Sequence, residues 1–190
     1  MPLFPSLPDN ASVPHVFERR PDIYAPFTRA TQAIMRGPSP LTPGERELIG
    51  AYVSGLNACR YCAGGHAAAA EQFGVAPGFL QTLLDTPEAA PVSDKLKPIL
   101  AYVRKLTLTS SRMTQADADA VYAAGWDERA LSDAIAVCCM FNFMNRLVDG
   151  HGVKANPAVF GERGRRHKEL GYIDQFPQLF EMEKAAAAAE

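Results

Sequence analysis

The chain has 190 residues, of which 47% are hydrophobic and 21% charged, and its formal net charge at pH 7 is −2. This length suffices to bury a core and corresponds most simply to one domain, although two small halves are also possible. Acidic and basic residues are interspersed, which argues against a nucleic-acid-binding surface. No uninterrupted apolar run is long enough to span a bilayer, and prolines and charges occupy the N-terminus where a signal peptide needs apolar residues. We therefore expect a cytoplasmic protein that binds neither nucleic acid nor membrane.

Helical periodicity dominates the sequence, and no run of alternating β-branched residues predicts a strand. The expected fold class is therefore all-α, a helical bundle formed by a single domain over residues 22–184. Residues 1–21 are predicted to form an N-terminal arm, which is extended in its proline-rich part up to residue 13. The alanine-rich residues 185–190 are predicted to be a frayed tail.

Six helices are predicted from apolar residues at helical spacing and from residues that begin and end helices. The clearest start is a capping box, in which Thr42 is the N-cap, Pro43 takes the first helical position and Glu45 closes the box. The helix that follows is apolar on most sides, which implies burial. The predicted helices run from Asp22 to about Met35, from Pro43 to about Leu56, from about Cys59 to Phe73, through 96–106, from Thr114 to near Gly125, and from Asp127 to Gly150.

The four cysteines form two close pairs, and only the first has a chemically useful spacing. Cys59 and Cys62 lie at the start of a predicted helix, where unpaired backbone N–H groups and the helix dipole stabilise a thiolate. Their separation puts both sulfurs on one face, close enough to form a disulfide. In the cytoplasm such a pair is more often catalytic or metal-binding than structural. Cys138 and Cys139 are adjacent, cannot easily bridge each other, and are predicted to be small core residues.

His66 follows Cys62 by four residues, which places its imidazole beside that thiol on the same helix face. There it can take the thiol proton or, as an imidazolium, lower the thiol pKa. Glu47 lies on the preceding predicted helix. The facing sides of the two helices carry small residues, so the helices can approach closely enough for Glu47 to orient His66. We therefore predict a thiol redox centre formed by Glu47, Cys59, Cys62 and His66.

Other residues of chemically active types lack such a context. His15, His151 and His167 show no ligand spacing and are predicted to be structural or solvent-exposed. Gly64 and Gly65 lie within a predicted helix, which costs stability unless another backbone or a substrate approaches closely there.

Two alternatives use the same residues. Cys59, Cys62, His66 and Glu47 are a chemically sensible ligand set for structural zinc, although helical spacing places the first three along about one and a half turns, which strains a tetrahedral site. The pair can also serve a redox-sensing module that cycles its disulfide without efficient turnover. Stoichiometric zinc with unreactive thiols would favour the first alternative, and slow oxidation with a partner-dependent response would favour the second.

The pattern Glu47-x11-Cys59-x2-Cys62-x3-His66 resembles the core motif of the AhpD-like alkylhydroperoxidase group within the carboxymuconolactone decarboxylase superfamily. The run 41–49, with Asn57, and the block 141–147 resemble the peroxidase-related branch of that group. The similarity extends from about residue 22 to residue 153. It implies an all-α fold and a homo-oligomer, either a dimer or a hexameric trimer of dimers.

The resemblance also implies an activity, thiol-dependent reduction of a hydroperoxide without metal, haem or flavin. By position, Cys62 matches the peroxidatic cysteine, Cys59 the resolving cysteine, and Glu47 and His66 the proton relay. An external dithiol or a thioredoxin-like protein is the implied reductant. One departure is Tyr61, because AhpD has a histidine at that position; it bears on substrate and reductant preference rather than on the thiol pair. The decarboxylases of the superfamily lack the cysteine pair, which argues against decarboxylation here.

Overall fold

The computed structural model describes residues 2–188, and this part of the chain is helical without a strand. The all-α prediction is thus confirmed. Three short 3-10 turns, η1 (Pro87–Ala89), η2 (Ser110–Arg112) and η3 (Pro157–Val159), interrupt the connections. The α-helices are α1 (Val13–Phe17), α2 (Pro21–Arg36), α3 (Pro43–Leu56), α4 (Arg60–Gln72), α5 (Phe79–Asp85), α6 (Lys97–Thr109), α7 (Gln115–Ala123), α8 (Glu128–Gly150), α9 (Phe160–Leu170) and α10 (Pro177–Ala187).

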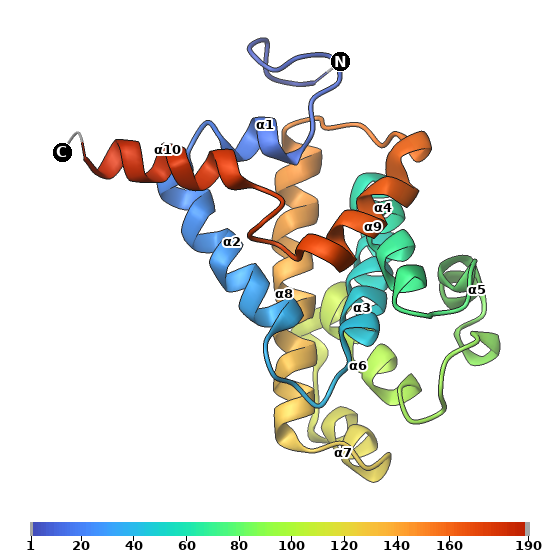
Figure 1. Cartoon of the computed structure of the whole chain (residues 1–190). Coiled ribbons are helices and arrows are strands. Elements are labelled where there is room, and N and C mark those ends of the chain that lie inside the picture. The colour runs from blue at the N-terminus through green and yellow to red at the C-terminus, as the bar shows by residue number, and fades with distance from the viewer. Residues whose placement is uncertain (1, 189–190) are drawn as a thin grey trace.

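The longest helix, α8, runs through the middle of the molecule, with α2 along one side and α3 and α4 along the other (Figure 1). Its N-terminus is capped by Asp127, whose carboxylate accepts a hydrogen bond from the backbone N–H of Ala130 at 2.8 Å. By length and composition alone α8 could cross a membrane, and within residues 2–188 it is the one such helix. Its packing against α2, α3, α4, α6 and α7 is that of a core helix.

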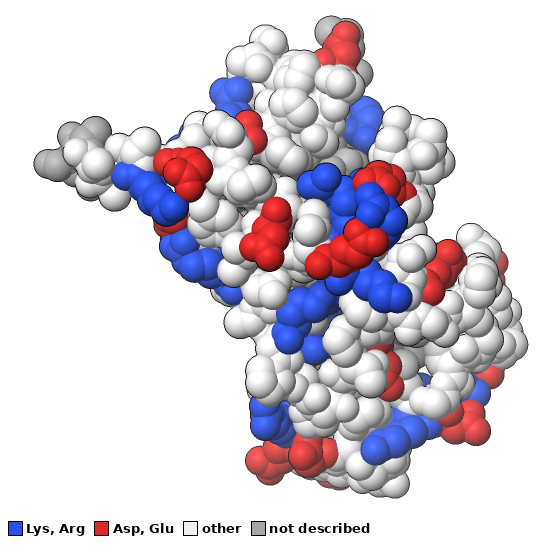
Figure 2. Space-filling model, viewed as in Figure 1, with Lys and Arg blue, Asp and Glu red and all other residues white. Residues whose placement is uncertain are grey.

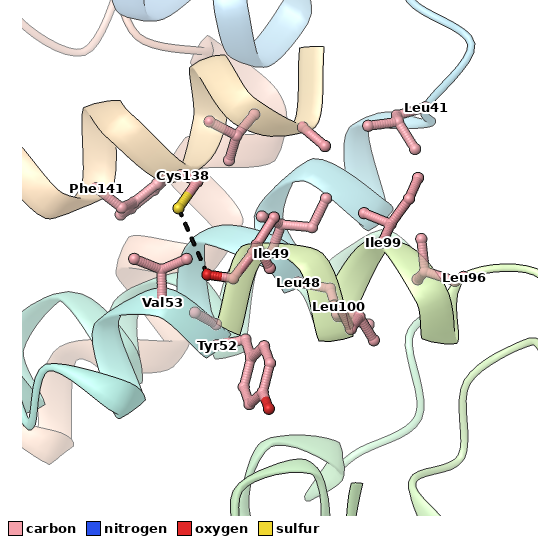
Figure 3. Packing of buried hydrophobic residues seen from close by; sticks show 14 of the residues in the cluster. Leu41, Leu48, Ile49, Tyr52, Val53, Leu96, Ile99, Leu100, Cys138 and Phe141 are labelled. Carbon is pink, nitrogen blue, oxygen red and sulfur yellow. Dashed lines mark hydrogen bonds between the residues drawn. The ribbon is translucent and has the colours of Figure 1, made fainter. Parts of the chain in front are cut away.

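The main hydrophobic core lies where α3, α6 and α8 meet. Figure 3 shows the facing side chains, which include Leu48, Ile49 and Val53 of α3, Ile99 and Leu100 of α6, and Cys138 and Phe141 of α8. Cys138 is fully buried there, as predicted, and its thiol donates to the carbonyl of Val103 at 3.7 Å. The core prediction is wrong for Cys139, which is exposed, because one step of about 100° turns it to the outer side of α8.

The six predicted helices correspond to α2, α3, α4, α6, α7 and α8, with ends that differ by at most a few residues. The capping box at Thr42 is present, with the Glu45 backbone N–H donating to the threonine hydroxyl at 3.2 Å. The helices α1, α5, α9 and α10 were not predicted. The first two are short, and the charged sequence of α9 shows no broad apolar stripe.

The two ends of the chain differ from the predicted arm and tail. The first residues form an exposed loop (Figure 1), but Leu7, Val16 and Phe17 are buried, together with Leu179 of α10, against the start of α4. We call this set of residues the terminal cluster. Helix α10 continues to Ala187, so the first part of the predicted frayed tail is helical. Residues 1, 189 and 190 lie outside the described part.

Candidate active site

The connection between α3 and α4 fixes where the thiol pair lies. The backbone N–H of Cys59 bonds to the carbonyl of Ser54 at 3.0 Å, and that of Ala58 to Gly55 at 2.9 Å. This tight turn holds Ala58 in the left-handed conformation, at a φ of 56°, which costs a non-glycine residue about 1–2 kcal/mol. The turn ends α3 and makes Cys59 the N-cap of α4. Both cysteines therefore lie at the positive end of a helix dipole.

The pKa values of the two thiols are shifted in opposite directions. Both are free and buried, Cys59 completely and Cys62 with 3% of its surface exposed. A hydrogen bond between the side chains lowers the pKa of Cys62 and raises that of Cys59, whose burial acts in the same direction. Burial opposes the shift at Cys62, while a hydrogen bond from Asn145 and the positive charge of Arg163 support it. Cys62 is thus the thiol that ionises first.

Asn145, whose side chain acts on Cys62, is buried and held by a network of side-chain hydrogen bonds. Its side-chain amide donates to the Ser54 hydroxyl at 2.9 Å, and its oxygen accepts from the side chain of Asn57 at 2.9 Å. The Ser54 hydroxyl in turn donates to the carbonyl of Gly50 at 2.7 Å. This network ties α8 to the end of α3 and orients the donor that supports a thiolate at Cys62.

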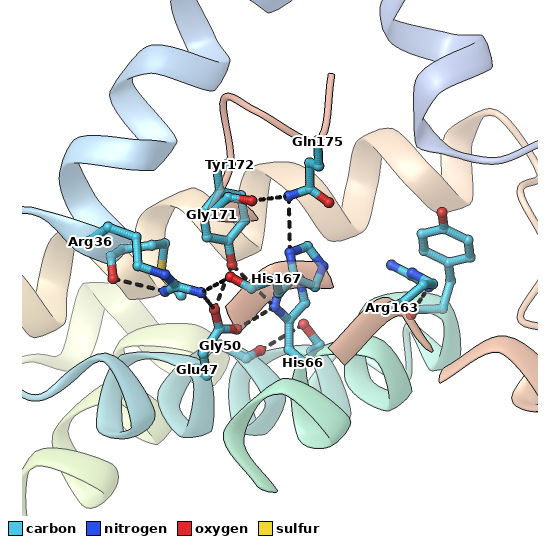
Figure 4. Close-up of polar contacts among 12 residues, drawn as sticks. Arg36, Glu47, Gly50, His66, Arg163, His167, Gly171, Tyr172 and Gln175 are labelled. Carbon is cyan, nitrogen blue, oxygen red and sulfur yellow. Dashed lines mark hydrogen bonds and ion pairs between the residues drawn. The ribbon is translucent and has the colours of Figure 1, made fainter. Parts of the chain in front are cut away.

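Glu47 and His66 form the predicted pair. The Glu47 carboxylate is fully buried and lies 2.7 Å from Nδ1 of His66 (Figure 4). It also accepts hydrogen bonds from Arg36 at 2.5 Å and from the hydroxyl of Tyr172 at 2.9 Å. Burial by itself raises the pKa of Glu47, but His66, His167 and Arg36 outweigh it and lower that pKa to about 2. The carboxylate is therefore ionised throughout the physiological range.

The contact between His66 and Cys62 is less direct than the sequence predicts. Both side chains line one cavity. The hydrogen bonds of His66 to other described residues use Nδ1, toward Glu47 at 2.7 Å and Tyr172 at 3.4 Å, and the ring packs edge-on to Phe141 at 4.5 Å. The described residues include no direct hydrogen bond between the imidazole and the Cys62 thiol. A molecule in the cavity can bridge them.

His167 is the main residue of the site that the sequence did not reveal. It is buried, and its ring stacks on that of His66 with 4.9 Å between centroids. The amide nitrogen of Gln175 lies 3.1 Å from its Nδ1. Burial, followed by the neighbouring His66, lowers the pKa of His167 to about 3, so the ring is neutral. The sequence places no signal near it, because α9 follows the cysteine motif by about a hundred residues.

The glycine pair in α4 is explained by α9. A side chain at Gly64 would collide with the ring of Phe160, and one at Gly65 with the guanidinium of Arg163. Gly164 of α9 in turn lies against the backbone of Ala68. The close approach that the glycines allow is thus between two helices, and it brings Arg163 and His167 to the thiol site.

The cavity that Cys62 and His66 share has a volume of about 330 Å³. Tyr61 lines it as well, with its ring 3.9 Å below the guanidinium of Arg163 and its hydroxyl accepting from the backbone N–H of Val13 at 3.2 Å. Cys59 lies outside the lining. The terminal cluster forms part of the cavity wall through Phe17. Only one sulfur of the pair therefore faces the space in which a small molecule can bind.

A metal site does not emerge from these residues. In the part of the chain that the structure describes, no three His, Cys, Asp or Glu side chains are grouped as metal ligands. Glu47, the carboxylate of the predicted ligand set, is engaged by Arg36 and His66. The zinc alternative gains no support from this arrangement.

Comparisons with a family model and with solved structures find similarity to the same group of proteins. The model of the carboxymuconolactone decarboxylase family matches residues 21–105. A peroxidase-related protein of unknown function from Silicibacter sp. TM1040 is 28% identical, with 78% of each chain covered and a TM-score of 0.72. An "alkylhydroperoxidase AhpD core" protein, also called peroxidase-related, from Ralstonia eutropha JMP134 is 26% identical, with 77% of each chain covered and a TM-score of 0.70. The search of curated proteins finds no match.

Proposed function

The chain belongs to the AhpD-like group of the carboxymuconolactone decarboxylase superfamily, and from the geometry of its site we propose that it is a thiol-dependent peroxidase. The observation that carries the proposal is the asymmetry of the thiol pair. Cys62 has the lowered pKa and faces a cavity that also holds His66, while Cys59 lies behind it within hydrogen-bonding reach. A peroxidatic and a resolving cysteine require this division.

The proposed reaction begins when the Cys62 thiolate attacks the distal oxygen of the hydroperoxide. The S–O bond forms as the O–O bond breaks, which gives a sulfenic acid and an alkoxide. His66, oriented by Glu47, receives the thiol proton through the bound hydroperoxide and returns it to the alkoxide, which leaves as an alcohol. Asn145 and Arg163 stabilise the thiolate before the attack.

Cys59 then completes the oxidative half of the cycle. Its thiol attacks the sulfenic sulfur of Cys62, a disulfide forms and water leaves. An external dithiol, or a thioredoxin-like protein, reduces this disulfide by two exchange steps and supplies both electrons and both protons. A cytoplasmic location would keep such dithiols reduced. We further propose that the protein works as a homo-oligomer without a bound cofactor.

The test is a thiol count before and after one equivalent of cumene hydroperoxide. It uses a Cys138→Ser/Cys139→Ser background, so that the only thiols counted are Cys59 and Cys62. We expect the background protein to lose both thiols, Cys59→Ser to yield a sulfenic acid that dimedone traps on Cys62, and Cys62→Ser to lose none. Turnover is followed with excess dihydrolipoamide as reductant.

Retention of full hydroperoxide turnover in Cys62→Ser would falsify the assignment. Loss of both thiols without catalytic turnover would instead indicate a redox sensor. If both thiols are lost but no dithiol tested supports turnover, the proposed enzymatic role is contradicted.

A further inference from the structure

The charges of α9 are divided between two sides of the helix. Arg165 forms ion pairs with Glu162, at 2.7 Å, and with Glu169. Arg163 and Arg166 line the cavity of Cys62, and within residues 2–188 neither forms an ion pair with an acid. Figure 2 shows basic and acidic side chains gathered over this helix. The cavity therefore receives two arginines that no described acid holds in an ion pair.

The two cavity arginines have different surroundings. Arg163 is half-buried, lies over the Tyr61 ring and donates to the Tyr61 carbonyl at 3.2 Å. Its charge acts on the adjacent Cys62 thiol. Arg166 is exposed, and its one hydrogen bond to a described residue is to the carbonyl of Gln175, at a long 3.4 Å. Arg163 is thus engaged at the thiol, while Arg166 has donors free for a bound molecule.

Most of the remaining cavity surface is apolar, although hydroxyl, amide and imidazole side chains such as Thr31, His66 and Gln175 also line it. Phe27, Phe141, Met144 and Phe176 contribute to its wall. Its volume of about 330 Å³ lies at the lower end of the range of small-molecule sites. Hydrogen peroxide has no apolar part that would use such a wall. The combination of an apolar chamber and a free guanidinium matches a molecule with a hydrocarbon body and one anionic group.

We propose that the substrate of this site is an organic hydroperoxide that carries a carboxylate, with its hydrocarbon body in the cavity and its carboxylate bound by Arg166. This inference rests on the proposed peroxidase function and adds the substrate class to it. A bidentate contact between the guanidinium and the carboxylate orients the peroxide oxygen toward Cys62. Arg166 then determines specificity, while Arg163 acts on the thiolate.

The test compares three substrates that share one hydrocarbon body: cumene hydroperoxide, its ring-carboxylated analogue, and the methyl ester of that analogue. We expect kcat/KM to favour the carboxylate over its ester by about tenfold, the worth of one charge-assisted contact at an accessible site. Arg166→Met should bring this ratio close to one, and Arg166→Lys should retain part of it. The matched control is Arg165→Met, which removes a cation from the same helix outside the cavity and should preserve the ratio.

Equal kcat/KM for acid and ester in the unmodified protein would overturn the proposal, as would an unchanged ratio in Arg166→Met. A second measurement needs no turnover: the rate at which iodoacetamide alkylates Cys62, with and without ring-carboxylated cumyl alcohol. Protection by the acid but not by its methyl ester, lost in Arg166→Met, supports the binding site even if the protein proves not to be a peroxidase. If all three substrates are turned over without such selectivity, the proposed peroxidase activity is supported and the proposed preference for a carboxylate is wrong.

Discussion

At the scale of single residues, the site depends on a carboxylate that would be unstable in isolation. Glu47 is fully buried among apolar helices, and a charge in that position is tolerated only when hydrogen-bonded partners surround it. Arg36, His66 and Tyr172 supply these partners from three different helices or loops. The same contacts that stabilise the fold therefore fix the orientation of the imidazole.

Replacement of Glu47 by glutamine tests both consequences. The change leaves Arg36 buried without its counter-charge, so we expect a loss of about 3 kcal/mol in the free energy of unfolding. It also removes the group that orients His66, so hydroperoxide turnover, in which His66 transfers the proton, should fall. Urea denaturation and turnover of cumene hydroperoxide measure the two effects. Tyr172→Phe removes one hydrogen bond to the same carboxylate and should cost only about 1 kcal/mol; equal losses in the two variants would contradict this account.

His167 predicts a dependence of stability on pH. Its pKa in the folded protein is about 3, below the ordinary value of 6.5, so between these values the unfolded chain binds a proton that the folded chain does not. Stability is therefore complete above pH 6.5 and decreases as the pH falls toward 3. Glu47, with a folded pKa of about 2 against 4.5, adds a decrease of the same sign below pH 4.5.

The measurement is the urea unfolding free energy of the unmodified protein and of His167→Gln between pH 7.5 and 5. We expect the unmodified protein to lose about 2 kcal/mol more than the variant over the interval from pH 6.5 to 5. Above pH 7 the two curves should run parallel, which provides the internal control. Parallel curves over the whole interval would show that His167 does not titrate as its burial implies.

At the scale of helices, the sequence predicts those helices that have a capping residue or a regular apolar periodicity. The box at Thr42 and the apolar periodicity of α3 and α8 locate those helices, and the four-residue spacing from Cys62 to His66 places both on one face of α4. Helix α9 has neither signal. Its contribution depends on the fold of the intervening chain, so His167 and Arg163 could not be assigned from their neighbours in sequence.

The contact between α4 and α9 can be tested at Gly64. Alanine there would place a methyl group within the ring of Phe160, so we expect a loss of about 1–3 kcal/mol in unfolding free energy and a displaced α9. Gly161→Ala is the matched control, since it lies in α9 with open space around its Cα. That change should be neutral or stabilise by up to about 1 kcal/mol. A tolerated Gly64→Ala would mean that the two helices do not pack as closely as the structure has them.

At the scale of the whole molecule, both ends of the chain close the site. The terminal cluster packs Leu7, α1 and α10 onto the start of α4, and it supplies one wall of the cavity. Prolines in the N-terminal segment predict extended backbone, but the partners of its buried Leu7 and Phe17 lie far along the chain. Local propensity cannot report such contacts. The proximity of Glu47 and His66 was thus predictable from one motif, while the enclosure of the site was not.

The outer side of α8 provides the last prediction, which concerns association between copies of the chain. Cys139 and Phe143 are exposed on this helix, Phe143 with 45% of its surface. Leu108 of α6 is 49% exposed. Its neighbour Thr107 contacts α8, because the Thr107 hydroxyl accepts a hydrogen bond from Asn142. We propose this face of α8 as the interface between subunits of the expected homo-oligomer. We expect the protein to sediment as a dimer or hexamer at micromolar concentration.

Phe143→Asp should shift this equilibrium toward the monomer, because an aspartate in an apolar interface would be buried without a partner. Leu170→Asp makes the same change at an exposed position of α9, which packs on α4 rather than on α8, and should leave the assembly intact. Sedimentation velocity across a concentration series measures both. If Phe143→Asp sediments like the unmodified protein, the face of α8 is not the interface; if the unmodified protein is a monomer, the expected homo-oligomer is wrong.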